Sequence, residues 1–185
     1  MEQARPSAEV AALRRRGVME AVAAYSFWGG LPLFYWWLRH VPPHEIVAHR
    51  ILWSVALILL LLLVRGTLGE LANALRQFRL VRPLILSALL IGVNWLVYIW
   101  AVGNGHVIAA SLGYFLNPLV NVLLGRLVLN ERLSRLQWVA VGIAAAGVAI
   151  LAIGALTTLW ISLTLALSFG TYGLIRKMAP TGPLI

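Results

Sequence analysis

Residues 106–129, HVIAASLGYFLNPLVNVLLGRLVL, decide the fold of this chain. The segment is long enough to cross a lipid bilayer as a helix, yet two amides and a proline lie near its middle. At about 100° per residue, one side of such a helix gathers the polar and small side chains. These are His106, Ala110, Gly113, Tyr114, Asn117, Asn121 and Gly125. The sequence therefore predicts a membrane helix with one polar face.

Pro118 frees a backbone acceptor on this polar face. Because proline has no N–H, it cannot donate to the carbonyl of Tyr114, which shares the face with Asn117 and Asn121. Polar groups at membrane depth are tolerated only inside protein or beside a water-filled cavity. We therefore expect this face to line a polar cavity. The alternative is that the two amides bond neighbouring helices and that Pro118 adds a tolerated kink.

The composition is that of an integral membrane protein. Of the 185 residues, 61% are apolar and 11% are charged, which lies outside the range of soluble domains. The net charge of +9 does not indicate nucleic-acid binding, because the Arg residues recur between apolar runs and form no single patch. The chain has no Cys, so it has neither a disulfide nor a thiolate metal site.

We predict an all-α membrane protein with about six transmembrane helices. The expected spans cover residues 18–38, 45–64, 84–103, 106–129, 134–154 and 157–175. Of the fifteen Lys and Arg residues, all except Arg39 and Arg50 fall before the first span, in or around the second and fourth connections, or after the sixth span. The positive-inside rule therefore places the N-terminus in the cytoplasm. The first span is long enough to be retained rather than removed as a signal peptide.

A short amphipathic helix is expected over about residues 67–81, on the cytoplasmic membrane surface. Thr67 and Glu70 have the spacing of a capping box. Apolar residues follow at helical intervals, opposite three Arg side chains that can meet anionic lipid.

The second span carries a cation at membrane depth. Its uninterrupted apolar part, residues 51–64, is too short to cross the bilayer, so residues 45–50 are recruited into the span. This draws His49 and Arg50 about 7 Å below the outer interface at 1.5 Å per residue. Arg50 is costly there, so it either snorkels outward or turns inward to line a cavity with His49.

The third span has a polar stripe of its own. Ser87, Asn94, Tyr98 and Ala101 share one side, and Trp95 lies beside it. The uncharged turn that follows makes this span an antiparallel neighbour of the fourth. We therefore expect the amides of the two spans to face the same interior.

The sequence holds no convincing catalytic set, and we expect a non-enzymatic protein. Ser111 lies near His106 but off the polar face, and no carboxylate is placed to orient the histidine. His40, His44 and His49 lack the spacing of metal ligands. Neither a cofactor nor a metal is therefore expected.

Five strings, in this order, resemble the RarD branch of the EamA-type drug/metabolite transporter superfamily. They are EIVAHRILWS (45–54), NWLVYIWAV (94–102), ASLGYFLNPLVNVLLG (110–125), NERLSRLQW (130–138) and SFGTYGLIRK (168–177). The resemblance runs from about Gly17 to the C-terminus. It implies ten helices in two inverted five-helix repeats, a central cavity built by both repeats, and movement of small metabolites or drugs across the bacterial inner membrane.

The resemblance supplies most of the candidate cavity-lining residues. The shared positions are His49, Arg50, Trp53, Asn94, Trp95, Tyr114, Asn117, Pro118 and Asn121, and Tyr98 joins them from the polar stripe of the third span. The shared Glu131 is a candidate partner for Arg132 or Arg135.

The resemblance also predicts the organisation of the chain. We expect a cytoplasmic tail over residues 1–16, a first five-helix repeat over 17–154, and the first helix of an inverted second repeat over 155–185, where the sequence stops four helices before the family does. The expected protein is a truncated multi-pass carrier with alternating access. Its expected partners are the lipid bilayer, a small solute, and a missing C-terminal half or a second copy. The alternative is a membrane binding or scaffold protein without transport.

Overall fold

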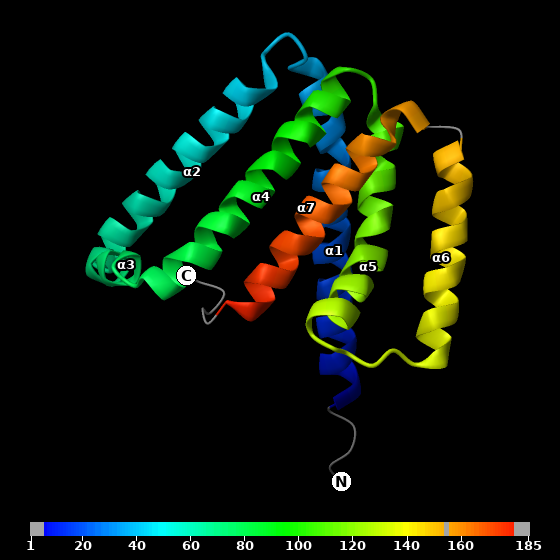
Figure 1. Cartoon of the computed structure of the whole chain (residues 1–185). Coiled ribbons are helices and arrows are strands. Elements are labelled where there is room, and N and C mark those ends of the chain that lie inside the picture. The colour runs from blue at the N-terminus through cyan, green and yellow to red at the C-terminus, as the bar shows by residue number, and fades with distance from the viewer. Residues whose placement is uncertain (1–5, 154–155, 180–185) are drawn as a thin grey trace.

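A computed structural model describes residues 6–153 and 156–179, and their regular elements are all helical (Figure 1). In chain order they are α1 (Pro6–Trp37), α2 (Pro43–Arg65), α3 (Leu68–Leu75), α4 (Phe78–Gly103), α5 (Val107–Val128), α6 (Arg135–Ile153), the 3₁₀ turn η1 (Leu156–Thr158) and α7 (Leu159–Met178). Within the described residues, four segments are long and apolar enough to cross a membrane: α2, α4, α5, and η1 together with α7. The predicted all-α membrane protein is confirmed.

The first and fifth expected spans differ from these four. α1 begins at Pro6, so residues 6–16, expected in a cytoplasmic tail, form its first turns. Alanine and arginine favour helix there, and Arg16 pairs with Glu20 one turn later, at 2.8 Å. α6 offers a shorter apolar run over Arg135–Ile150. Residues 1–5 of the expected tail, the expected repeat boundary at 154–155 and residues 180–185 lie outside the described residues.

The expected surface helix over residues 67–81 is shorter than predicted. α3 ends at Leu75, and the backbone of Gln77 is extended, with φ −88° and ψ 91°. Phe78 then begins α4, so the apolar pattern that continues past Leu75 belongs to a different helix. Thr67 is the N-cap residue of α3, but its side chain makes no capping hydrogen bond. The break follows from the change of direction between a helix on the surface and one that enters the bundle.

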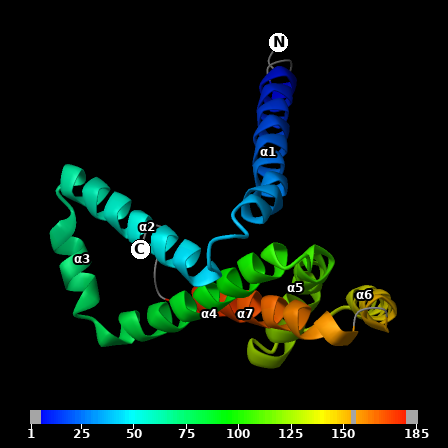
Figure 2. The same ribbon diagram turned by 90° about the horizontal axis from the view of Figure 1, so that it is seen from above.

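The centre of the molecule is formed by α4, α5 and α7, and α7 packs most extensively along the other two (Figure 1). The side chains that are completely buried come from α4 and α7, and they are Ala101, Val102, Ile161, Ser162, Leu165 and Ala166. Figure 2 shows α1 and α2 leading away from this centre in different directions, with α6 at the edge beyond α5. These outer helices leave large apolar side chains exposed, which suits contact with lipid.

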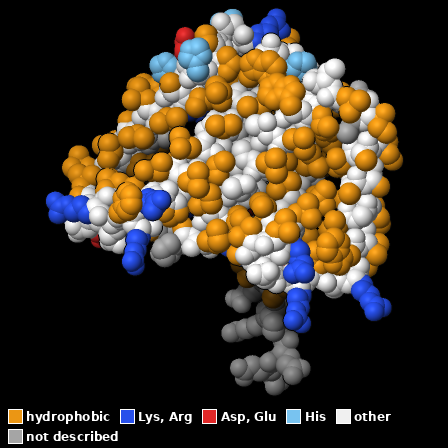
Figure 3. Space-filling view, in the orientation of Figure 1, with side chains coloured by type: hydrophobic (Ala, Val, Ile, Leu, Met, Phe, Trp, Pro, Cys, Tyr) orange, Lys and Arg blue, Asp and Glu red, His pale blue; other side chains and the backbone are white. Residues whose placement is uncertain are grey.

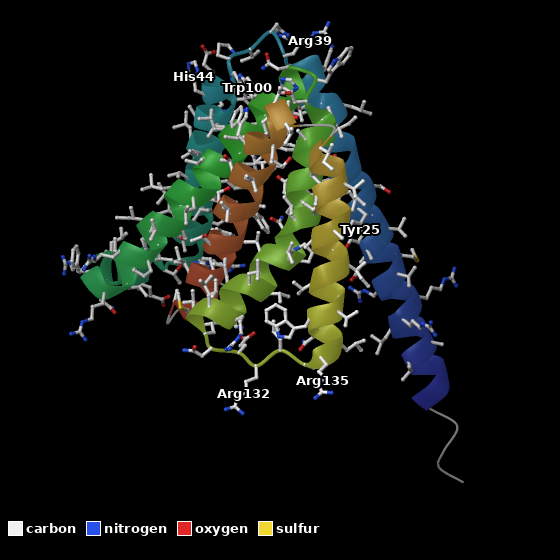
Figure 4. The ribbon with its side chains drawn as sticks, turned by 45° about the vertical axis from the view of Figure 1, so that its right-hand side comes forward. Tyr25, Arg39, His44, Trp100, Arg132 and Arg135 are labelled. Atoms are coloured by element: carbon white, nitrogen blue, oxygen red, sulfur yellow. The ribbon has the colours of Figure 1, made fainter. Side chains whose placement is uncertain are left out.

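Most of the charged residues lie near the ends of the helices. In Figure 3, blue Lys and Arg side chains lie at the lower end and at the lower left, near α3, and blue also appears at the upper end beside the pale-blue His side chains. Arg132 and Arg135 are at the opposite end of the bundle from Arg39 and His44 (Figure 4). The faces between these ends are mainly apolar, as expected for surfaces at membrane depth.

Two glycines allow α5 and α7 to approach closely. A Cβ added at Gly113 would lie 2.8 Å from the Cβ of Leu165 and 3.0 Å from the carbonyl oxygen of Ser162. One added at Gly170 would lie 2.5 Å from Val120 Cγ1. The Ser162 hydroxyl also donates to the carbonyl of Ala109 at 2.6 Å. Small residues at a membrane helix interface permit this kind of approach.

We expect Gly113→Ala to destabilise the protein by about 1–3 kcal/mol, the usual cost of overpacking. The new methyl group would meet the backbone of Ser162, which cannot move without separating α5 from α7. The measurement is the midpoint of thermal unfolding in detergent. Gly92→Ala on α4 is the matched control, because a Cβ there meets nothing within 4 Å. Equal midpoints for the two variants would contradict the close approach.

Candidate functional site

A cavity of about 720 Å³ opens between α1, α2 and α4, near the end that carries Arg39. Its walls are mainly aromatic and aliphatic, and its polar groups come from Tyr35, His49, Arg50 and Ser54. On α2, the lining residues recur at intervals of three and four, so they lie on one face of the helix. The full lining is Phe27, Trp28, Leu31, Phe34, Tyr35, Leu38, Val41, Ile46, His49, Arg50, Trp53, Ser54 and Trp95.

Arg50 joins the three helices around this cavity. Its Nη1 donates to the hydroxyl of Tyr35 on α1 at 3.0 Å. Its Cζ lies 3.6 Å from the ring centroid of Trp95 on α4. A guanidinium over an indole face gains about 0.5–2 kcal/mol, depending on how far it is desolvated. Arg50 is therefore turned toward α1 and α4, in the inward arrangement that the sequence left open.

Edge-to-face aromatic contacts connect the cavity with the centre of the molecule. The ring of Trp95 lies 5.7 Å from that of Tyr98, and Tyr98 lies 5.7 Å from Tyr114 on α5. Tyr114 in turn lies 6.3 Å from Phe169 on α7. Such pairs favour fixed ring orientations. Tyr98 and Tyr114, both predicted site residues, therefore form the link between the open cavity and the packed core.

Asn94 lies in the packed interface between α4 and α7, and it is not a lining residue of the cavity. Its side chain is 1% exposed. The Nδ2 group donates to the carbonyl of Leu165 and to the hydroxyl of Ser168, both at 2.9 Å. The Tyr114 hydroxyl makes a longer contact of 3.5 Å to its Oδ1. The interior that the sequence predicted for this amide is thus filled by α7.

The three candidates at the middle of α5 have different surroundings. Asn117 is buried, and its Oδ1 has no hydrogen-bond partner among the described residues. Pro118 is exposed within a continuous helix. Asn121 is exposed and lines a smaller cavity of about 240 Å³ with Glu131 and Lys177.

The ten predicted site residues therefore fall into separate groups. His49, Arg50, Trp53 and Trp95 line one cavity, whereas Asn121 lines the other. The direct binding of a solute by any of the ten remains a prediction. Glu131 pairs with Lys177 at 3.0 Å, and its expected pairing with Arg132 or Arg135 is wrong, because the end of α7 folds back beside the α5–α6 connection.

Two partners of the predicted site residues, Tyr35 and Ser168, were not predicted from the sequence. Tyr35 contacts Arg50 from α1. Its spacing of seven residues from Trp28 places both on one face of α1, and this periodicity was the available signal. For Ser168, the pairing with Asn94 spans 74 residues of sequence, and no local pattern predicts it.

The chain is similar to several bacterial proteins that are named RarD or named as transporters. The chain is 48% identical over 171 residues to the protein RarD of Streptomyces exfoliatus and 44% identical over 182 residues to that of Escherichia coli. It is 47% identical over 175 residues to an uncharacterized transporter of Pseudomonas aeruginosa. Each comparison covers 92% of this chain but 54%, 59% and 57% of the respective relatives. The chain thus spans little more than half their length. No solved structure matches it.

The family assignment rests on most of the chain. Residues 15–153 match the EamA-like transporter family, a region that includes α2, α4, α5 and the cavity around Arg50. The expected resemblance to RarD proteins is confirmed by the relatives named above. This chain belongs to the EamA-like transporter family.

Proposed function

We propose that this chain serves the transport of small metabolites or drugs across the bacterial inner membrane by alternating access. The family and its relatives support a membrane transporter of unspecified substrate. Relatives in Pseudomonas aeruginosa, Vibrio cholerae and Bacillus subtilis carry the name of uncharacterized transporter. One Pseudomonas aeruginosa relative is named for chloramphenicol sensitivity, which makes chloramphenicol a reasonable first solute to test.

The cavity between α1, α2 and α4 is the observation that carries this proposal. Its volume of about 720 Å³ falls in the range of small-molecule sites, and its lining combines aromatic walls with a few polar groups. A smaller cavity lies near the other end, beside Asn121 and Lys177. In the proposed cycle, movement of α1 and α2 against the packed α4, α5 and α7 opens the solute path to one side and then the other.

We expect proteoliposomes that contain the full chain, at a density that lets two copies associate and the second copy take the place of the missing half, to release a preloaded solute faster than protein-free liposomes. Chloramphenicol and a pool of small cytosolic metabolites are the starting solutes, followed by mass spectrometry of the external medium. A carrier binds its solute at a limited number of sites, so the protein-dependent rate should saturate with concentration. Rates equal to those of empty liposomes for every solute would contradict the proposal.

The second candidate is a membrane binding or scaffold protein without transport. The burial of Asn94 favours it, because this amide bonds α7 and does not face an open cavity. The apolar outer surfaces of α1 and α2 are also compatible with protein contacts. The scaffold predicts solute binding or protein association without saturable flux, so the liposome measurement separates the two functions.

The distribution of basic residues supports an N-terminus in the cytoplasm. Because the chain has no Cys, single cysteines at His44 and Arg132 can report the two ends of the bundle without background. In spheroplasts, a membrane-impermeant maleimide should label His44→Cys and leave Arg132→Cys unlabelled until the cells are lysed. The opposite pattern would reverse the orientation.

We expect Asn117→Leu to lower flux without lowering stability. The Oδ1 of Asn117 is buried without a partner among the described residues, so an apolar residue of similar size removes a desolvated group at no cost. Asn94→Leu is the comparison, because it removes two hydrogen bonds between α4 and α7, and we expect it to destabilise by about 1 kcal/mol. Thermal unfolding and flux are measured for both. Unchanged flux in Asn117→Leu would show that the Asn117 amide is not needed for transport.

A further inference from the structure

We infer that the cavity beside Arg50 takes a small organic anion, whose charged group binds Arg50 and whose aromatic or aliphatic body lies against the tryptophans. This inference names a substrate class and therefore rests on the proposed transport function. It starts from the positive charge of the cavity.

The charge of Arg50 has no compensating carboxylate in the described structure. The two ion pairs among the described side chains join Arg16 to Glu20 and Lys177 to Glu131, far from this cavity. Glu45 precedes Arg50 by five residues on α2, and at 100° per residue the two side chains point about 140° apart. A cation at membrane depth is costly unless it is paired. Binding an anion in the cavity would therefore compensate the charge of Arg50.

The guanidinium of Arg50 also has N–H groups that make no hydrogen bond to the described residues. It carries five N–H groups, and the Tyr35 hydroxyl is its one hydrogen-bond acceptor among the described residues. The contact of its Cζ with the Trp95 ring uses no hydrogen-bond acceptor, so N–H groups along the edge of the guanidinium stay available for hydrogen bonds. A carboxylate or phosphate can accept two parallel hydrogen bonds from such an edge. Tyr35 and Trp95 thus hold Arg50 in position while leaving it able to bind an anion.

The rest of the cavity selects the body of the ligand. Trp28, Trp53 and Trp95 line it together with two phenylalanines, and its volume leaves room for a small organic molecule beside the guanidinium. His49 and Ser54 add polar groups that are not acidic. A small inorganic ion would leave these aromatic walls without contact. The combination of one cation and a broad aromatic wall fits an anion with an apolar body.

Arg39 provides a matched control from the same end of the molecule. It too is an arginine over an indole, with its Cζ 4.2 Å from the ring centroid of Trp36. It is exposed, as Arg50 is, but unlike Arg50 it does not line the cavity. If any positive charge near this end of the molecule were enough to bind the anion, removing either arginine would weaken anion binding to the same extent. If the cavity binds the anion, only Arg50 matters.

The experiment uses the full chain in lipid nanodiscs at neutral pH, with 3-phenylpropionate as the anionic probe and 3-phenylpropanol as the neutral one. Binding is followed by saturable change in tryptophan fluorescence, with protein-free nanodiscs subtracted. We expect the anion to bind about tenfold more tightly than the alcohol, the size of a charge-assisted hydrogen bond. Arg50→Gln should abolish this preference, whereas Arg39→Gln should retain it.

Arg50→Lys keeps the inference testable if Arg50→Gln fails to fold. Lysine retains the charge but loses the planar fork, so we expect a reduced preference for the anion. Thermal unfolding of each variant checks folding independently. Equal binding of the two probes, no saturable binding of 3-phenylpropionate, or a preference that survives in Arg50→Gln would overturn the inference.

The outcomes for the anion site and for transport are separable. Arg50-dependent anion binding together with no flux of any solute in liposomes would uphold this inference and overturn the proposed function. Solute flux that does not depend on the charge of the solute and is unchanged in Arg50→Gln would uphold the proposed function and overturn this inference.

Discussion

A lipid bilayer offers no hydrogen bonds, and the central packing of this protein meets that constraint through Asn94. Its amide donates to a backbone carbonyl and a hydroxyl of α7, at a position that is almost completely buried. Ser162 makes the reciprocal connection from α7 to the backbone of α5. These bonds draw α7 between α4 and α5, and the small residues Gly113 and Gly170 let the backbones approach. The polar groups thus act first as the connections between helices.

The same packing explains why the open cavity lies to one side. With α7 filling the space beside α4 and α5, the open cavity lies between α4 and the diverging helices α1 and α2 (Figure 2). Arg50 bridges that face through Tyr35 and Trp95. The ring contacts from Trp95 through Tyr98 to Tyr114 then join the cavity to the packed centre. A change at the cavity can therefore reach the central helices through contacts between rigid rings.

Much of the secondary structure could be predicted because the signals are local. Hydropathy and the turn residues placed the helices at α2, α5 and α6 within a few residues of their bounds. The depth of His49 and Arg50 in their span suggested that they could line a cavity together, the resemblance added Trp53, and all three line the cavity. The surface helix was extended too far because its apolar pattern continues past Leu75, whereas the backbone turns at Gln77. The spacing of apolar residues along the chain does not show where the backbone changes direction.

The sequence by itself determined which segments are helical, how deep Arg50 and the amides of Asn94 and Asn117 lie within them, and the family to which they belong. Depth and face follow from rise per residue and rotation per residue, which are fixed by the hydrogen bonding within each helix. Only the tertiary structure decided what each polar group meets. Asn94 bonds a residue 71 positions away, and Arg50 meets an indole on α4 because three separate helices converge there. Packing between distant segments sets those partners, and no local sequence pattern encodes them.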